Sequence, residues 1–186
     1  MTFTLTDLDR FKTGGFPTDY PPDRRVFFAP VDDVHGALTA VITSATRSLS
    51  IGMFGWDDPD LQAALLAKMT DPNIVVQVTL DSSQAGGKHE RELLATWYDP
   101  ATATPLTSVV SVGRSEHGAI MHMKAVVVDA RFTVTGSTNW SVGGESAQDN
   151  ELTVTDSRAQ AADLQHRLDR IHLDQLQKAA AKATRP

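Results

Sequence analysis

The chain has 186 residues, of which 41% are hydrophobic and 22% charged, and its formal net charge is −6. This composition is typical of a globular protein and excludes a disordered or fibrous one, and the length suits one domain with a sizeable core. No apolar run approaches the length of a membrane span. Cysteine is absent, which excludes disulfides and thiolate metal sites. The acidic balance lacks the overall basic surplus common in nucleic-acid-binding proteins, although a local basic site is compatible with it.

The N-terminal residues 1–25 mix Thr, Asp, Gly and Pro without a sustained period, which predicts an irregular arm. Residues 1–9 lack the basic start and apolar segment of a secretory signal. If Met1 is the native start, we expect a cytoplasmic protein without a membrane anchor. We expect the main domain over 26–180 and a frayed tail over 181–186.

Strands and helices are predicted to alternate along the main domain, which indicates a layered α/β fold. In chain order, we expect strands at 26–30, 48–54, 73–80, 106–112, 123–128, 131–135 and 150–155. Helices are expected to begin near positions 34, 59, 88 and 156, with a loop at 140–149 that contains Gly143 and Gly144. Either Asp57 or Asp58 is expected to cap the helix at Pro59. His35 and His172 are expected on helix surfaces.

The most informative stretch is 121–140. His122 and Lys124 are two residues apart, so a regular strand places an imidazole and an ammonium on one face, where they suit an anionic substrate. Asp129 lies five positions beyond Lys124, and this odd offset sends its carboxylate to the opposite face. We therefore expect Asp129 to support the structure rather than to contact substrate.

A second short strand then leads to Gly136, which permits a sharp turn. After this turn, Ser137 and Asn139 can enter the same site, and both side chains can donate hydrogen bonds to a phosphate oxygen. No phosphate-binding glycine loop, HExxH motif or other metal-ligand pattern is present, so neither a metal nor a cofactor is implied.

Six of these residues stand at a defined spacing, His122-x-Lys124-x4-Asp129-x6-Gly136-Ser137-x-Asn139. This pattern resembles the HKD signature of the phospholipase D superfamily, and the resemblance covers roughly residues 26–154. It implies a phospholipase D-like fold, with a mixed, largely parallel sheet and helices on both faces, and a phosphodiesterase activity.

The resemblance also implies roles for the site residues. His122 would be the nucleophile that forms a phosphohistidine, and Lys124, Ser137 and Asn139 would bind the phosphate. Glu151 resembles the downstream glutamate that orients the catalytic histidine in this family, where a carboxylate on one ring nitrogen leaves the other free to attack. Asp129 would brace the fold or an interface.

The chain contains the motif only once, yet cleavage needs a nucleophile and an acid on opposite sides of phosphorus. Short bacterial members of the resembled superfamily supply the second copy by homodimerisation. We therefore expect a C2 homodimer in which both His122 side chains share one cleft.

The leading functional hypothesis is a metal-independent nuclease that acts on DNA or RNA, because the short, single-motif members that the chain resembles are mostly nucleases. The first alternative is a phospholipase D or phosphatidyl transferase that acts on lipid with the same site. The second is a nucleic-acid-binding module with weak or no catalysis, which the acidic balance and the unexplained arm permit.

Overall fold

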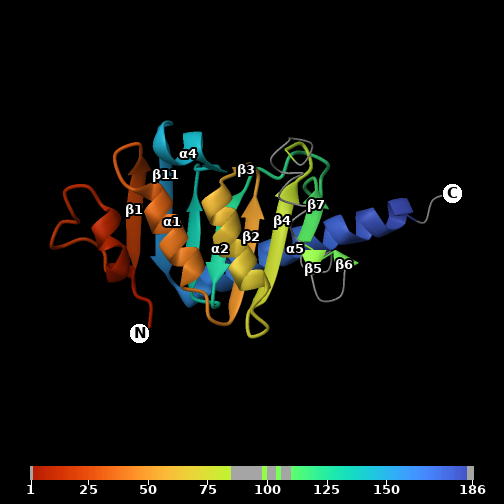
Figure 1. Ribbon diagram of the computed structural model, residues 1–186, viewed down its shortest axis with the longest axis horizontal. Helices are drawn as coiled ribbons and strands as arrows, with labels where there is room; N and C mark the ends of the chain where they lie inside the picture. Colours follow the sequence, from red (N-terminus) through yellow and green to blue (C-terminus); the bar gives the residue numbers. More distant parts are fainter. Residues whose placement is uncertain (1, 85–97, 100–103, 106–109, 184–186) are drawn as a thin grey trace.

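Seven strands of this computed structural model form one mixed sheet (Figure 1). The structure describes residues 2–84, 98–99, 104–105 and 110–183. The strand order across the sheet is β1-β11-β9-β8-β2-β4-β7. These strands are β1 (Arg24–Ala29), β2 (Ser48–Met53), β4 (Val75–Asp81), β7 (Val110–Gly113), β8 (Lys124–Val128), β9 (Phe132–Gly136) and β11 (Asn150–Asp156). Two further pairs of short strands are β3 (Trp56–Asp57) with β10 (Trp140–Ser141), and β5 (Tyr98–Asp99) with β6 (Thr104–Pro105).

The pairing within the large sheet differs in one respect from the prediction. The single α/β domain is confirmed, but the expectation of a largely parallel sheet is wrong. Only β2 with β4 and β4 with β7 pair in parallel, whereas the other four pairings are antiparallel. The strands β8 and β9 follow each other through a tight turn, and a tight turn can join only antiparallel neighbours.

Helices cover both faces of the sheet, as predicted. Figure 1 shows α1 (Val34–Thr43) and α2 (Pro59–Met69) on one face and the long α5 (Arg158–Ala183) on the other. Asp33 caps α1 by accepting from the Gly36 amide, and Asp58 caps α2 by accepting from the amides of Asp60 and Leu61. The predicted cap for the second helix is thus confirmed as Asp58, with Pro59 in the first turn.

Two predicted irregular regions contain regular structure. The N-terminal arm forms a short 3-10 helix, η1 (Leu5–Phe11), whose Leu5 and Leu8 are buried in the main core. The loop predicted at 140–149 contains β10 and a short helix, α4 (Val142–Ser146). The helix predicted over 88–98 falls on residues outside the described part of the chain, except for Tyr98, which begins β5.

The core has two parts because β8 is buried on both faces. Val126 and Val128 pack into the main cluster beneath α1 and α2. Val127, on the other face, packs against Ala161 and Leu168 of α5. Also on α5, His172 was expected at the surface but is 7% exposed, with Nδ1 near the hydroxyl groups of Thr79 and Ser111. Those two hydroxyls give the buried ring its polar partners.

Strands β8 and β9 form a hairpin whose turn is held by Asp129. Asp129 and Ala130 adopt positive φ angles of 53° and 52°. The Asp129 carboxylate accepts hydrogen bonds from the amides of Thr46, Arg47 and Ser48 at 2.8–3.1 Å, and from the Thr46 hydroxyl at 2.7 Å. These bonds outweigh the effect of burial and lower the pKa of Asp129. Asp129 therefore fixes the hairpin turn to the start of β2.

The opposite end of the hairpin depends on Gly136. Its φ angle is 152°, and a Cβ atom placed there would lie 2.1 Å from the backbone oxygen of Glu151. Leu152 pairs with Gly136, so any side chain at this position would push β11 away from β9. Glycine thus allows the close approach that turns the chain toward Ser137.

We expect Asp129→Asn to lower the free energy of unfolding by about 1–3 kcal/mol at pH 7, because an amide satisfies fewer of the four donors. The pKa of Asp129 is lowered in the folded state, so the carboxylate stabilises the protein above its ordinary pKa and loses this effect as the pH falls through the lowered value. Urea unfolding should therefore show the largest difference between variant and wild type near pH 7, narrowing below about pH 4.

The matched control is Asp163→Asn, which removes an exposed carboxylate from α5. It should change stability by less than about 0.5 kcal/mol. Equal effects of the two substitutions would contradict the role given to Asp129.

We expect Gly136→Ala to destabilise the protein by more than about 2 kcal/mol, because backbone must move to admit the methyl group. Gly118→Ala is the matched control, since Gly118 has φ 82° but open space around its Cβ position. It should cost only about 1 kcal/mol from backbone strain. Thermal or urea unfolding measures both, and a similar cost for the two would show that the approach of Glu151 is unimportant.

Candidate functional site

His122 and Lys124 lie at the end of β8 that is remote from Asp129. His122 is exposed and lies two residues before Lys124, the first residue of β8, which is 7% exposed. The Lys124 Nζ donates to the His122 backbone oxygen at 3.1 Å. The His122 imidazole is thus open to solvent, and the Lys124 ammonium group is held against the backbone of His122.

Phe54, at the end of β2, contacts both residues. Its ring centroid lies 4.5 Å from that of His122, and the Lys124 Nζ lies 4.8 Å from it. Sequence reasoning did not select Phe54 as a site residue. The aromatic residues directly after the strand predicted at 48–54 were the pattern that could have indicated it. The ring limits the positions open to the imidazole and covers one side of the ammonium.

Burial lowers the pKa of Lys124. Among the described residues, no carboxylate forms an ion pair with it, and its hydrogen bond is to a neutral carbonyl. An ammonium group has three donors, so capacity is left for a ligand. An anionic oxygen at this place would offset the cost of burying the charge, which makes the site suited to phosphate.

Ser137 and Asn139 follow β9 at the same end of the hairpin. The Ser137 hydroxyl donates to Asn150 Oδ1 at 2.9 Å and accepts from the Glu151 amide at 3.1 Å. The Asn139 side chain packs against Gly55, and its Oδ1 is buried without a hydrogen-bond partner among the described residues. The loop is therefore ordered by its own contacts, and Asn139 Oδ1 is left as an acceptor without a described donor.

Glu151 lies on the other face of the sheet from Lys124. Leu152 and Val154 of the same strand pack into the main core, as Val126 does, so alternation sends Glu151 to the α5 face. Its Oε1 accepts from the Thr153 hydroxyl at 2.6 Å. Within the part of the chain that the structure describes, no hydrogen bond joins Glu151 to His122, and the orienting role of Glu151 stays a prediction. Alternation instead places Asn150 on the Lys124 face.

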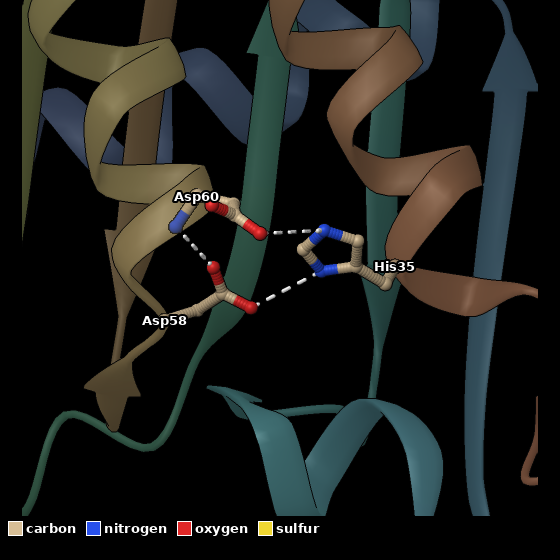
Figure 2. Close-up of side chains that lie close together, drawn as sticks. All are labelled: His35, Asp58 and Asp60. Atoms are coloured by element: carbon tan, nitrogen blue, oxygen red, sulfur yellow. Dashed lines mark hydrogen bonds and ion pairs between the residues drawn. The ribbon is translucent and has the colours of Figure 1, made fainter.

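A second cluster of polar residues escaped the sequence analysis. Figure 2 shows His35, at the start of α1, facing Asp58 and Asp60 at the start of α2. The His35 Nδ1 lies 3.1 Å from Asp58 Oδ2 and 2.7 Å from Oε2 of Glu145, which comes from α4. Burial raises the pKa of Glu145 to about 7, against the opposing effect of the His35 hydrogen bond. His35 was expected to be an ordinary surface residue, and nothing in the local sequence indicates that α2 and α4 meet it.

The comparisons with known proteins agree with the fold and the motif. Residues 38–172 match a protein-family model described as "Cardiolipin synthase, PLD-like domain". A curated relative is the mitochondrial cardiolipin hydrolase of Xenopus tropicalis, which is 26% identical over 141 residues. The alignment covers 75% of this chain but only 61% of that protein, so the chain spans about three fifths of the relative's length.

Two solved structures share the fold over most of this chain. The phospholipase D family member Nuc from Salmonella typhimurium aligns with a TM-score of 0.67 and 19% identity, covering 82% of this chain and 94% of Nuc. NucT from Helicobacter pylori aligns with a TM-score of 0.63 and 18% identity, covering 82% of this chain and 96% of NucT.

In the described part of the chain, no helix is both long enough and apolar enough to cross a membrane.

The family match spans the strands of the hairpin, the residues His122 to Asn139 and most of α5. The chain therefore belongs to the phospholipase D-like domain family and has the fold of that superfamily's phosphodiesterases.

Proposed function

We propose that this protein is a nuclease that cleaves a DNA or RNA phosphodiester through a phosphohistidine on His122. The observation that carries the proposal is the exposed His122 imidazole beside the buried ammonium of Lys124, which forms no ion pair with any described residue. The imidazole is open to the phosphate of a polymer. Lys124 and the Asn139 amide would hold the non-bridging oxygens and stabilise the charge that develops on them, and Ser137 would join them once its hydroxyl turns from Asn150 Oδ1 to the phosphate.

The second half of the proposal is a site shared by two subunits. One histidine cannot attack phosphorus and protonate the leaving oxygen from the opposite side in the same step. The sequence carries one copy of the motif, and we propose that a second chain supplies the second His122. In the C2 homodimer that we propose, one His122 attacks and the other donates the proton, and the roles reverse when water hydrolyses the intermediate.

The choice of nucleic acid over lipid rests on two supports. The short, single-motif proteins that the sequence resembles are mostly nucleases, and this chain aligns with 94% of Nuc and 96% of NucT. It spans only 61% of the cardiolipin hydrolase. That relative nevertheless makes a lipid phosphodiester the second candidate substrate.

We expect His122→Ala to reduce cleavage of single- and double-stranded DNA and of RNA by at least about 10³-fold, with the mass of the dimer unchanged. The assay contains excess EDTA, since the proposed chemistry uses no metal ion. His117→Ala, which removes an exposed loop histidine five residues away, is the matched control and should keep wild-type activity. Full cleavage by His122→Ala would refute the assignment of the nucleophile.

The substrate class is tested by offering the same wild-type preparation nucleic acid and vesicles that contain cardiolipin or phosphatidylcholine. We expect turnover of nucleic acid to exceed that of lipid, and both to need His122. Preferential lipid turnover would replace the nuclease with a phospholipase. Nucleic-acid binding that weakens steeply with salt, without cleavage of any substrate, would favour the binding module.

A further inference from the structure

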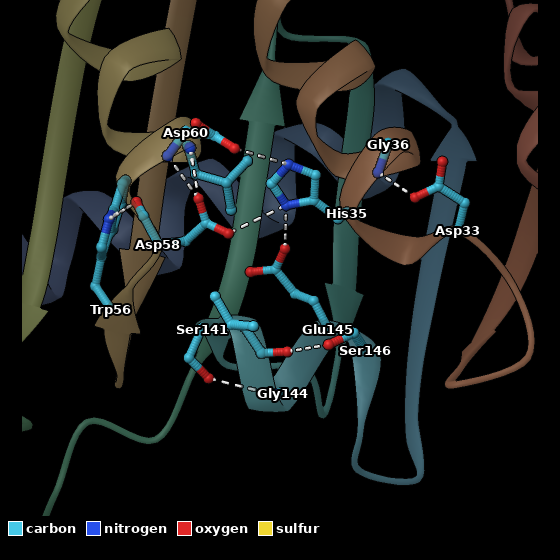
Figure 3. A network of polar contacts seen from close by, with 12 residues as sticks. Asp33, His35, Gly36, Trp56, Asp58, Asp60, Ser141, Gly144, Glu145 and Ser146 are labelled. Atoms are coloured by element: carbon cyan, nitrogen blue, oxygen red, sulfur yellow. Dashed lines mark hydrogen bonds and ion pairs between the residues drawn. The ribbon is translucent and has the colours of Figure 1, made fainter.

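The cluster around His35 lies where the first turns of three helices meet. His35 comes from α1, Asp58 and Asp60 from the start of α2, and Glu145 from α4 (Figure 3). The side chains of Asp58 and Glu145 are 4% and 1% exposed, whereas that of His35 is 37% exposed. Two carboxylates thus lie in the interior, behind an imidazole that solvent can reach.

One buried oxygen of this cluster has no donor among the described residues. Asp58 uses Oδ1 to cap α2, accepting from two amides at 2.8 Å, and directs Oδ2 at the His35 ring. Glu145 directs Oε2 at the same ring nitrogen, and its Oε1 is buried without a hydrogen-bond partner among the described residues. Figure 3 shows the Glu145 carboxylate below the His35 ring and Asp58, with dashed lines from both carboxylates to the same ring nitrogen. One N–H cannot serve all of these oxygens.

The geometry suits a cation held by the same atoms. Ligand atoms bound at 2.0–2.2 Å to one ion lie roughly 3.0–3.5 Å from one another. His35 Nδ1 lies 3.1 Å from Asp58 Oδ2 and 2.7 Å from Glu145 Oε2, so a shift of a few tenths of an ångström (roughly) would admit an ion. Asp60 is close to two of these residues, since one ligand atom each of His35, Asp58 and Asp60 lies within 4.8 Å of the others.

Asp60 completes the arrangement on the outer side of the ring. Its Oδ2 lies 3.9 Å from His35 Nε2 in a side chain that is 82% exposed. A histidine that binds a metal through one ring nitrogen commonly donates the N–H of the other nitrogen to a carboxylate, which orients the ring. Asp60 needs only a small side-chain rotation to take that place.

We propose that His35 Nδ1, Asp58 and Glu145 bind one divalent transition-metal ion, with Asp60 orienting the imidazole. An imidazole nitrogen with two carboxylate oxygens favours Zn²⁺ over Mg²⁺, which prefers oxygen ligands and keeps its waters. The ion neutralises the two buried carboxylates and joins the first turns of α1, α2 and α4.

This metal site would brace the segment behind the phosphate-binding loop. Glu145 lies six residues after Asn139, and the intervening Trp140 packs on Trp56 with ring centroids 4.4 Å apart. Trp56 in turn precedes Asp58 by two residues. The ion would therefore stabilise this part of the fold without taking part in cleavage, and it is proposed independently of the nuclease activity.

The test uses untagged full-length protein that has been stripped with EDTA and then freed of the chelator. Isothermal titration calorimetry with Zn²⁺, Mn²⁺ and Mg²⁺ should show one tight Zn²⁺ site per chain and weak or no Mg²⁺ binding, and Zn²⁺ should raise Tm. Glu145→Gln and His35→Ala should abolish the site. Asp60→Asn, at an exposed position that leaves the fold intact, should weaken Zn²⁺ binding by about 10-fold or more.

His166→Ala is the matched control, because His166 is an exposed histidine on α5, away from the cluster. It should leave Zn²⁺ binding and Tm unchanged. Absence of a one-to-one Zn²⁺ site in well-folded wild type would overturn the proposal and leave protonated His35 as the counter-charge. The proposal would also be overturned if two single variants both kept the wild-type Zn²⁺ affinity, one of them Asp60→Asn and the other either Glu145→Gln or His35→Ala. None of these readouts depends on cleavage, so they do not bear on the nuclease proposal.

Discussion

The hairpin of β8 and β9 is the constraint on which the candidate site depends, and it gives the motif spacing a physical meaning. From Lys124 a five-residue strand leads to the turn at Asp129, and a second five-residue strand leads back to Gly136. Two strands of equal length bring the residues before β8 and after β9 to the same edge of the sheet. Asp129, at the far end, lies about 17 Å from Lys124 along the strand and acts through Thr46, Arg47 and Ser48.

Burial on both faces makes this hairpin a rigid support. Val126 and Val127 pack into different clusters on opposite sides of β8, and α5 covers one of them. This arrangement also buries the Lys124 ammonium group at the edge of the core next to Phe54, which costs free energy of solvation. A site of this kind is preorganised for an anion, because the charge is fixed in position before a phosphate arrives.

Sequence reasoning predicted the two strands of the hairpin, a cap for α2 at Asp57 or Asp58, and the polar residues that follow Gly136, since all of these depend on local spacing. It failed where distant segments meet. The antiparallel pairings of β11 cannot be read from one strand, and the Gly143-Gly144 pair masked the short helix α4. His35 and His172 looked like surface residues because their partners, Glu145 and Thr79, lie more than ninety residues away.

The face on which Glu151 lies is a further limit of sequence reasoning. A carboxylate close to the motif suggested a partner for His122, but strand alternation assigns the Lys124 face to Asn150, which already accepts from Ser137. A shift of one position reverses the side of a sheet that a residue occupies. The register of β11 with β9, which only the structure supplies, therefore decides which polar group stands behind the loop.

The central claim is that two copies of His122 act in one site, and subunit mixing tests it most directly. Wild type and His122→Ala are mixed in equal amounts, exchanged to equilibrium and assayed on one DNA substrate. If each cleft needs both histidines, only dimers of two wild-type chains are active. Activity then falls to about a quarter of that of wild-type protein at the same total protein concentration. Activity of about a half would show that each chain works alone and would contradict the shared site.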